Sequence, residues 1–139
     1  MAEIFLRKFR PKRVCDPFCG SGTTLVEATA LGVESVGCDI SEFNCLLTRV
    51  KTARYDLRLL EHEIRDILTQ LNLQMPGGLF SDADELHRET NSDYLKIWFH
   101  PNALQELLYY RSLIANYQYQ DVLKVILSRA ARSSRLTTH

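Results

Sequence analysis

The 139-residue sequence has no excess of charge of either sign, because 17 Lys and Arg residues balance 17 Asp and Glu residues. A module that binds nucleic acid by bulk electrostatics carries a net positive charge, so the composition alone argues against that class. The balance conceals a gradient, since residues 1–13 are rich in basic side chains and residues 61–93 are acidic. Hydrophobic residues make up 45% of the chain, which excludes a disordered protein and is typical of a globular domain.

Long apolar runs and metal-binding cysteine patterns are also absent. No run approaches the roughly 18 apolar residues that can span a bilayer, and the N-terminus lacks the basic-then-apolar order of a signal peptide. We therefore expect a cytoplasmic protein. The spacing of the cysteines matches no zinc-binding pattern, and no histidine lies near them in the sequence. We expect no bound metal and reduced, packed thiols at Cys15, Cys19, Cys38 and Cys45.

The N-terminal third has the pattern of a short parallel βαβ unit. Phe5 and Phe9 recur at helical spacing in a basic arm that ends at Pro11. Four elements then follow one another: a strand at 13–16, a loop at 17–22, a helix at 23–31 and a strand at 33–40. Gly32 is placed to close the helix, and Ser41 is a suitable N-cap for a further helix. This order of elements predicts a βαβ unit.

The rest of the chain has helical spacing. Apolar residues at steps of three and four predict an amphipathic helix with one apolar face: Leu57, Leu60, Ile64, Ile67, Leu68 and Leu71. An acidic linker is expected at about 74–93, beginning with the helix-breaking run 75–78. Residues 94–99 fit either a strand or a helical turn. Pro101 suits the first position of another helix, which we expect to continue after a break near Asn116.

The glycine loop has the residues for an adenosine-type ligand without phosphates. Asp16 leads into Gly20-Ser21-Gly22 and a helix N-terminus, where backbone N–H groups and bare Cα atoms face a ligand. No Lys follows the last glycine as in a Walker loop, and Leu25 replaces the third glycine of the dinucleotide pattern. The Asp16 carboxylate would repel a pyrophosphate and favour a ligand with an ammonium and a sulfonium. Asp39, at the end of the second strand, is placed to accept hydrogen bonds from ribose hydroxyls. The alternative is that both acids only cap the following helices.

Residues 16–24, Asp-Pro-Phe-Cys-Gly-Ser-Gly-Thr-Thr, and residues 37–40, Gly-Cys-Asp-Ile, carry a family resemblance. They resemble the cofactor motif of S-adenosylmethionine-dependent DNA methyltransferases that modify the exocyclic amino group of adenine or cytosine. The resemblance covers about residues 5–50 and implies S-adenosylmethionine as cofactor and DNA as substrate. It implies these cofactor-binding residues: Asp16, Pro17, Phe18, Cys19, Gly20, Ser21, Gly22, Thr23, Thr24, Asp39, Ile40 and Ser41.

In that family the loop contacts the methionine and ribose parts of the cofactor, and the acid that matches Asp39 holds the ribose. Ile40 and Ser41 would lie beside the adenine. This sequence has Ser41-Glu42 where the family often has Asn-Pro. RNA guanine amino-methyltransferases also resemble the loop, including its Asp-Pro-Phe-Cys-Gly run, and are the alternative within the same class.

The catalytic motif of the family is absent from this sequence. That motif is Asp, Asn or Ser followed by Pro-Pro and an aromatic residue, whereas the prolines here stand singly at 11, 17, 76 and 101. In it, a side-chain oxygen and a backbone carbonyl accept hydrogen bonds from the target amino group, and the ring stacks on a flipped base. We therefore expect an N-terminal fragment, truncated or split, with no catalytic residue and no methyl transfer by this chain alone.

Several side chains of the C-terminal half have two interpretations. Arg129, Arg132 and Arg135 recur every third residue and are candidate DNA contacts, although a solvated helix face is the more common reason for such spacing. Six aromatic residues could stack bases but are more often core: Trp98, Phe99, Tyr109, Tyr110, Tyr117 and Tyr119. In a different class of function, the helices at 94–135 would be the partner surface of a non-catalytic assembly module.

The expected fold is therefore α/β, a partial Rossmann-like methyltransferase fold with a mostly helical C-terminal half. Residues 1–54 would form the cofactor-binding βαβ unit with its N-terminal arm, and residues 55–139 the helical subdomain. Two strands leave open edges, which predicts that the chain self-associates or exchanges elements between copies.

Overall fold

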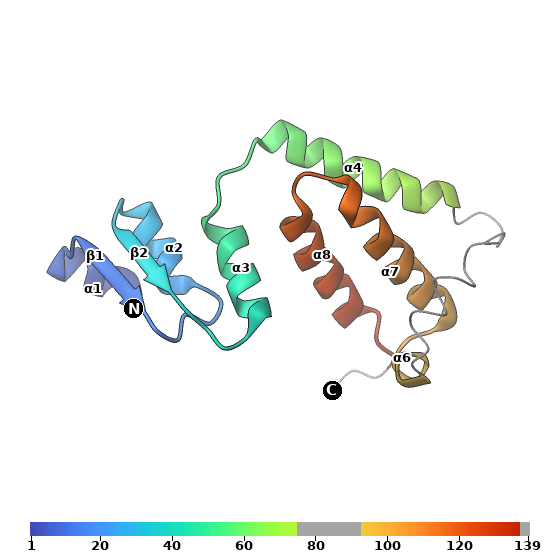
Figure 1. Ribbon diagram of the computed structural model, residues 1–139, viewed down its shortest axis with the longest axis horizontal. Helices are drawn as coiled ribbons and strands as arrows, with labels where there is room; N and C mark the ends of the chain where they lie inside the picture. Colours follow the sequence, from blue (N-terminus) through green and yellow to red (C-terminus); the bar gives the residue numbers. More distant parts are fainter. Residues whose placement is uncertain (75–92, 137–139) are drawn as a thin grey trace. The chain divides into compact units, whose positions relative to one another are not determined.

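A computed structural model describes residues 1–74 and 93–136 of the chain (Figure 1). The chain divides into two compact units, Met1–Tyr55 and Asp56–His139. The first contains a two-stranded parallel sheet and three helices, and the described part of the second is helical. The predicted mixed α/β class with a mainly helical C-terminal half is confirmed. The predicted break at 75–78 and the acidic linker up to residue 92 lie outside the described residues.

The first unit is a βαβ unit flanked by two helices. Its elements are α1 (Ala2–Phe9), β1 (Arg13–Asp16), α2 (Thr23–Ala30), β2 (Glu34–Gly37) and α3 (Glu42–Thr52). Figure 1 shows β1 and β2 side by side, in a parallel register that pairs Arg13 with Glu34 and Asp16 with Gly37. The second strand is shorter than the predicted 33–40. It ends at Gly37, which pairs with Asp16 at the end of β1, and the Phe18 N–H donates to the Asp16 side chain at 3.2 Å instead of continuing the ladder.

Local signals set the helix boundaries of this unit. The helix α1 ends at Phe9, and its C-cap residue Arg10 adopts the left-handed conformation at φ 45° just before Pro11. After α2, Gly32 takes φ 69°, as predicted for the residue that follows a helix. The side-chain oxygen of Ser41 accepts a hydrogen bond from the Asn44 N–H at 3.4 Å, so the predicted N-cap of α3 is confirmed.

The helix α2 covers one face of the sheet. Burial alternates along both strands, and the buried side chains of Leu25 and Ala28 lie on the covered side. On the other side, Val36 is 62% exposed and Cys15 is also exposed. All four thiols are free, but the prediction of packing is wrong for Cys15 and Cys38, which are exposed. A parallel sheet is ordinarily covered on both faces, so this sheet is half covered.

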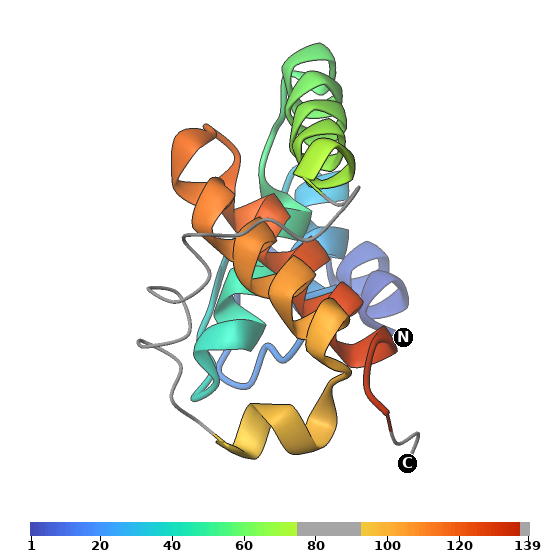
Figure 2. The same ribbon diagram turned by 90° about the vertical axis from the view of Figure 1, so that its right-hand side faces the viewer.

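In the second unit, α7 (Pro101–Leu113) packs against α4 (Leu57–Gln74) and α8 (Gln120–Ser133). The short elements α6 (Asp93–Trp98) and η1 (Ile114–Asn116) precede and follow α7. Figures 1 and 2 both show α7 and α8 side by side. The main core contains these buried residues: Ile67, Tyr110, Leu113, Ile114 and Leu123.

The apolar face of α4 is narrower than the sequence predicts. Ile64, Ile67 and Leu71 contact the core, whereas Leu57 is 73% and Leu68 is 47% exposed. Leu68 follows Ile67 directly and is therefore turned by about 100° around the helix axis. The prediction that Leu57 and Leu68 belong to the buried face of α4 is therefore wrong.

Residues 94–99, for which a strand and a helical turn were the alternatives, contain both helix and strand-like pairing. The helix α6 ends at Trp98, and Phe99 then forms an isolated antiparallel bridge with Arg135. Pro101 occupies the first turn of α7 as predicted, and Nδ1 of His100 accepts a hydrogen bond from the Asn102 N–H at 3.4 Å. The predicted break near Asn116 is also confirmed, because η1 ends there.

A polar network joins α4 to the turn before α8. The buried carboxylate of Glu63 accepts hydrogen bonds from the N–H groups of Gln118 at 2.8 Å and Tyr119 at 3.0 Å. The hydroxyl of Tyr117 donates to Oδ2 of Asp66 at 2.7 Å. Phe99 and Tyr110 are buried, Trp98, Tyr109 and Tyr117 pack against the two apolar clusters, and the Tyr119 hydroxyl accepts from the Asp56 N–H at 3.0 Å. All six candidate stacking residues therefore pack or bond within the unit. None of the helices in the described ranges is long and apolar enough to cross a membrane.

Candidate functional site

The candidate site lies where both parallel strands end. The loop 17–22 leaves β1 and enters α2, and residues 38–41 leave β2 and enter α3 (Figure 1). Cys38 N–H donates to the Asp16 carbonyl at 3.0 Å, and Cys19 N–H donates to the Cys38 carbonyl at 3.0 Å. These bonds hold the two segments together at the carboxyl edge of the sheet, where α/β proteins bind ligands.

The two glycines of the loop serve different purposes. Gly20 and Gly22 have positive φ angles of 51° and 80°, which side chains other than glycine rarely adopt. A Cβ on Gly22 would lie 2.5 Å from Oγ1 of Thr48, so the loop can approach α3 only with a glycine there. A Cβ on Gly20 would meet no atom within 4 Å. Gly22 therefore permits packing, whereas Gly20 borders open space.

Asp39 connects the loop to the start of α3. Its Oδ2 atom accepts a hydrogen bond from Gly20 N–H at 2.8 Å. Its Oδ1 atom accepts from Ser41 N–H at 2.9 Å and from the side-chain amide of Asn44 at 3.0 Å. The carboxylate thus braces the first turn of α3, as the capping alternative expects, but capping does not account for the bond to Gly20.

These donors keep the Asp39 carboxyl group ionised. The pKa of Asp39 is held below its ordinary value mainly by the hydrogen bond from the Ser41 N–H, then by that from the Asn44 amide, and least by that from the Gly20 N–H. Partial burial raises the pKa but does not cancel this effect. A carboxylate has about four acceptor positions. Oδ1 uses two of them within this unit and Oδ2 uses one, so Oδ2 can accept one further hydrogen bond.

Each of the two acids is followed closely in the sequence by a large apolar side chain that is exposed: Phe18 two residues after Asp16, and Ile40 directly after Asp39. Phe18 is 88% exposed and Ile40 is fully exposed. The Asp16 carboxylate is half buried and accepts a hydrogen bond from Phe18 N–H at 3.2 Å, within the loop. The site thus combines two acids with exposed apolar surface.

The other residues of the motif have mainly structural contacts. Cys19 is 8% exposed, and its thiol lies 3.9 Å from the Thr48 hydroxyl. Pro17 has an exposed side chain, and its carbonyl accepts from the Cys38 thiol at 3.3 Å. Among the described residues, no side chain caps the N-terminus of α2, which begins at Thr23 beside Gly22.

Sequence analysis missed three residues of α3 that contact the loop. The Asn44 side chain binds Asp39 as above, the Thr48 hydroxyl donates to the Gly20 carbonyl at 3.2 Å, and Lys51 Nζ donates to the Ser21 carbonyl at 2.8 Å. Their spacing of four and three residues is the available sequence signal, because it places polar groups on one helix face. Nothing in the sequence indicates that this face meets the glycine loop.

The candidate DNA contacts do not form one helical stripe. Arg129 and Arg132 lie on α8, but the helix ends at Ser133 and Arg135 lies beyond it. The Arg135 guanidinium lies over the Trp98 ring, 5.6 Å from its centroid. No group of metal-ligating side chains occurs within residues 1–74 and 93–136.

Comparison with known proteins identifies the segment that holds the glycine loop. Residues 10–49 match the N6/N4 methyltransferase family model, which is described as DNA methylase. This segment is homologous to the DNA methylases. The resemblance seen in the sequence is therefore confirmed for this part of the chain.

Individual relatives include two type II methyltransferases and a tRNA methyltransferase. The type II methyltransferase M.MjaII of Methanocaldococcus jannaschii is 47% identical over 57 residues, 41% of this chain and 11% of that protein. The type II methyltransferase M.MvaI of Kocuria varians is 27% identical over 120 residues, 86% of this chain and 26% of that protein. The tRNA (guanine(10)-N2)-dimethyltransferase of M. jannaschii is 31% identical over 81 residues, 50% of this chain and 22% of that protein. The matched part of this chain thus spans between 11% and 26% of these curated relatives. No solved structure matches the chain significantly.

Proposed function

We propose that the unit Met1–Tyr55 binds S-adenosylmethionine as part of a DNA methyltransferase that methylates an exocyclic amino group of adenine or cytosine. The observation that carries this proposal is the Asp39 carboxylate, which bonds Gly20 at the edge of open space and retains an acceptor position. The DNA methylase match over residues 10–49 supports it.

The residues of the site suit the chemical groups of this cofactor. Oδ2 of Asp39 would accept a hydrogen bond from a ribose hydroxyl, since an ionised acceptor strengthens such a bond. The side chains of Phe18 and Ile40 would cover the adenine, because both are exposed apolar groups on the two segments that follow the strands. The uncapped N–H groups at the start of α2 would bind the methionine carboxylate. Asp16 would favour the positive charges of the ammonium and the sulfonium.

Methyl transfer would need two contributions: the methyl group of the cofactor, and catalytic residues that this chain lacks. The bound cofactor would supply an activated methyl group to the amino nitrogen. Acceptors for the amino protons come from the Pro-Pro-aromatic motif, which does not occur in the 139 residues. We propose that this chain holds the cofactor and that methylation requires a segment or partner with that motif. A cytoplasmic location remains a prediction of the sequence.

Titration calorimetry of the 139-residue chain with S-adenosylmethionine tests the proposal. We expect micromolar to millimolar affinity, and a loss of about tenfold, or 1.4 kcal/mol, in Asp39→Ala. Glu42→Gln is the matched control, because it also removes a carboxylate at the start of α3 but one that is exposed. The proposal fails if the chain does not bind, or if both variants weaken binding equally.

A second candidate is an RNA guanine amino-methyltransferase. It is favoured by the similarity to the tRNA (guanine(10)-N2)-dimethyltransferase, which covers half of this chain. The two candidates share the cofactor site and differ in the target strand. Methylation of DNA or of tRNA, after the chain is combined with the protein that carries the missing motif, distinguishes them. The alternative of a non-catalytic assembly module would be supported by a folded chain that binds no S-adenosylmethionine.

A further inference from the structure

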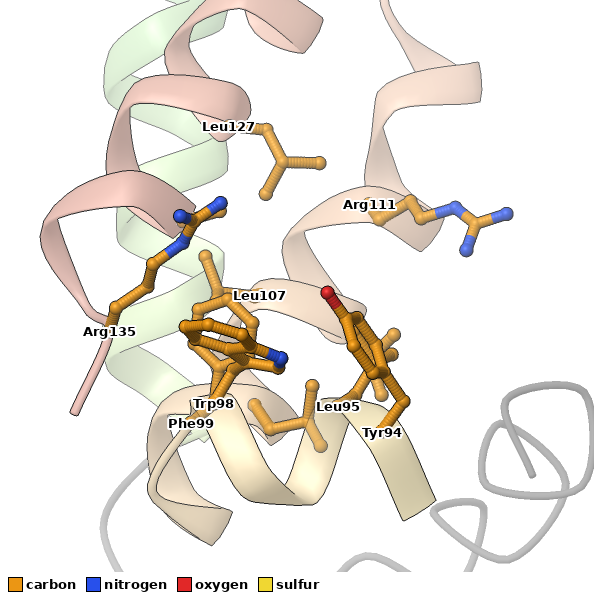
Figure 3. Close-up of a pocket in the computed structure, with 11 residues that line it drawn as sticks. Tyr94, Leu95, Trp98, Phe99, Leu107, Arg111, Leu127 and Arg135 are labelled. Carbon is orange, nitrogen blue, oxygen red and sulfur yellow. The ribbon is translucent and has the colours of Figure 1, made fainter. Parts of the chain in front are cut away.

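The helical unit contains an aromatic pocket that has no role in the cofactor site proposed above. Residues from α6, α7, α8 and the segment after α8 surround a cavity of about 380 Å³. Figure 3 shows its main side chains: Tyr94, Leu95, Trp98, Phe99, Leu107 and Leu127. Phe99 belongs to a small buried cluster with Leu104 and Leu108, so the floor of the pocket is closely packed.

The charges at this pocket are all positive. Arg111 and Arg135 are the charged residues that line it, and no acidic residue of the described ranges does so. Neither guanidinium pairs with a carboxylate in the part of the chain that the structure describes. From residue 122 to residue 136 the sequence contains basic residues and no acid. An anionic group at the rim would therefore be favoured.

The rings of the pocket favour a flat ligand over an aliphatic one. The ring centroids of Tyr94 and Trp98 are 5.9 Å apart, and the Arg135 guanidinium lies over the Trp98 ring, 5.6 Å from its centroid. Figure 3 shows Arg135 beside Trp98, and Arg111 on the side of Tyr94 with its guanidinium directed outward. Nucleic-acid bases stack on aromatic rings and on guanidinium planes, whereas an alkyl chain uses neither surface specifically.

We propose that this pocket binds a nucleotide, with its base against Trp98 and Tyr94 and its phosphate charge balanced by Arg135 and Arg111. The nucleotide is either a free mononucleotide or one residue of a single strand, since both present a flat base and a phosphate. The proposal depends on the helical unit alone and does not require that the first unit binds S-adenosylmethionine.

Trp98 provides a direct test, because it is the single tryptophan of the 139-residue chain. Its fluorescence is followed while the chain is titrated with a deoxymononucleotide, the matching nucleoside and a short single-stranded deoxyoligonucleotide. We expect both phosphate-containing ligands to quench the fluorescence, and the nucleoside to bind about tenfold more weakly. Tighter binding of the oligonucleotide identifies a strand as the source, and equal binding identifies a free nucleotide. Absence of quenching at millimolar ligand, or equal binding of the nucleoside and the nucleotide, overturns the proposal.

Substitutions at the rim separate this site from general charge attraction. Arg135→Gln is expected to weaken nucleotide binding about tenfold, and Trp98→Leu, measured by calorimetry, to weaken it by about the same factor. Arg58→Gln is the matched control, because Arg58 is exposed on α4 and does not line the pocket. Circular dichroism checks that each variant is folded. An equal loss in Arg58→Gln overturns the proposal. If Arg135→Gln leaves the affinity for S-adenosylmethionine unchanged, nucleotide binding by the helical unit is independent of cofactor binding by the first unit.

Discussion

The Asp39 carboxylate accepts a hydrogen bond from the Gly20 N–H at 2.8 Å, although the two residues are 19 positions apart in the sequence. The bond is possible because the parallel pairing of β1 and β2 brings both strand ends to one edge. It fixes the glycine loop without filling the space beside Gly20. The same carboxylate also supports the first turn of α3 through Ser41 and Asn44. One side chain therefore orders the loop, the second strand end and the helix that follows.

The first prediction concerns acid pH. The pKa of Asp39 is lowered by its hydrogen-bond donors, with Ser41 N–H the main one. Such a carboxyl group stabilises the folded state above its unfolded pKa of about 4, and this contribution is lost as the pH falls through the folded pKa. We expect Asp39→Asn to lower the melting temperature of the α/β unit near neutral pH and to differ less from the wild type in acid. Melting curves between neutral and acid pH check this.

Glu42→Gln is again the control, since Glu42 is exposed at the start of α3. A melting difference for Asp39→Asn that stays constant between neutral and acid pH would contradict the assignment of these donors to the ionised carboxylate.

The second prediction separates the two loop glycines. Gly22→Ala would place a Cβ 2.5 Å from Oγ1 of Thr48 at a positive φ, so we expect a destabilisation of more than about 2 kcal/mol. Gly20→Ala meets no atom within 4 Å and should cost only about 1 kcal/mol for its positive φ. Denaturant unfolding measures both changes.

Gly20→Ala should affect cofactor binding more than it affects stability. Because the added methyl group enters the open space, we expect Gly20→Ala to remain folded and to bind S-adenosylmethionine at least about tenfold more weakly. If Gly20→Ala binds as tightly as the wild type, the cofactor does not occupy this space. Thr48→Ala in the Gly22→Ala background tests the steric cause, since removal of Oγ1 should restore part of the lost stability.

The sequence predicts the local features of the first unit because their causes are local. Pro11 ends an arm, Gly32 follows a helix and Ser41 caps one, and each effect depends on a few neighbouring residues. The contact between Thr48 and Gly22 is different, since it depends on how α3 packs after the strands have paired. No periodicity within α3 can indicate it.

Exposure was predicted less well than secondary structure for a related reason. Cys15 and Val36 have the character of buried strand residues, yet they are exposed because α2 covers a single face of the sheet. Leu68 repeats the helical spacing but lies beside the core and not in it. The apolar character of a residue shows that burial is favourable, and only the packing partner decides whether it happens.

The third prediction compares a buried tyrosine, Tyr110, with a partly buried one, Tyr117, in the helical unit. The Tyr110 hydroxyl is buried without a hydrogen-bond partner among the described residues, and burial raises the pKa of Tyr110 to about 12. The Tyr117 hydroxyl donates to Asp66 at 2.7 Å and accepts from the Gln70 side chain at 3.0 Å. Removal of an unpaired buried hydroxyl relieves a desolvation cost, whereas removal of the Tyr117 hydroxyl loses a hydrogen bond to a charged carboxylate, although Asp66 keeps its bond from Gln70 at 2.8 Å.

We therefore expect Tyr110→Phe to be neutral or to stabilise the helical unit by up to about 1 kcal/mol, and Tyr117→Phe to destabilise it by about 1–3 kcal/mol. The two substitutions remove the same atom, so each is the control for the other in denaturant unfolding. Equal destabilisation by both would show that the Tyr110 hydroxyl has a partner.

The fourth prediction concerns the uncovered sheet. Its two strands have unpaired edges and one face with exposed Cys15 and Val36, and such edges and faces favour association with another sheet. We expect the 139-residue chain to self-associate at micromolar concentration. Val36→Lys places a charge on this face and should shift the population to monomers, as light scattering after size-exclusion chromatography would show. Leu57→Lys is the matched control, because Leu57 is 73% exposed and belongs to α4 of the other unit. Dispersal by Leu57→Lys to the same extent would indicate general apolar association, and a monomeric wild type across the range would refute the prediction.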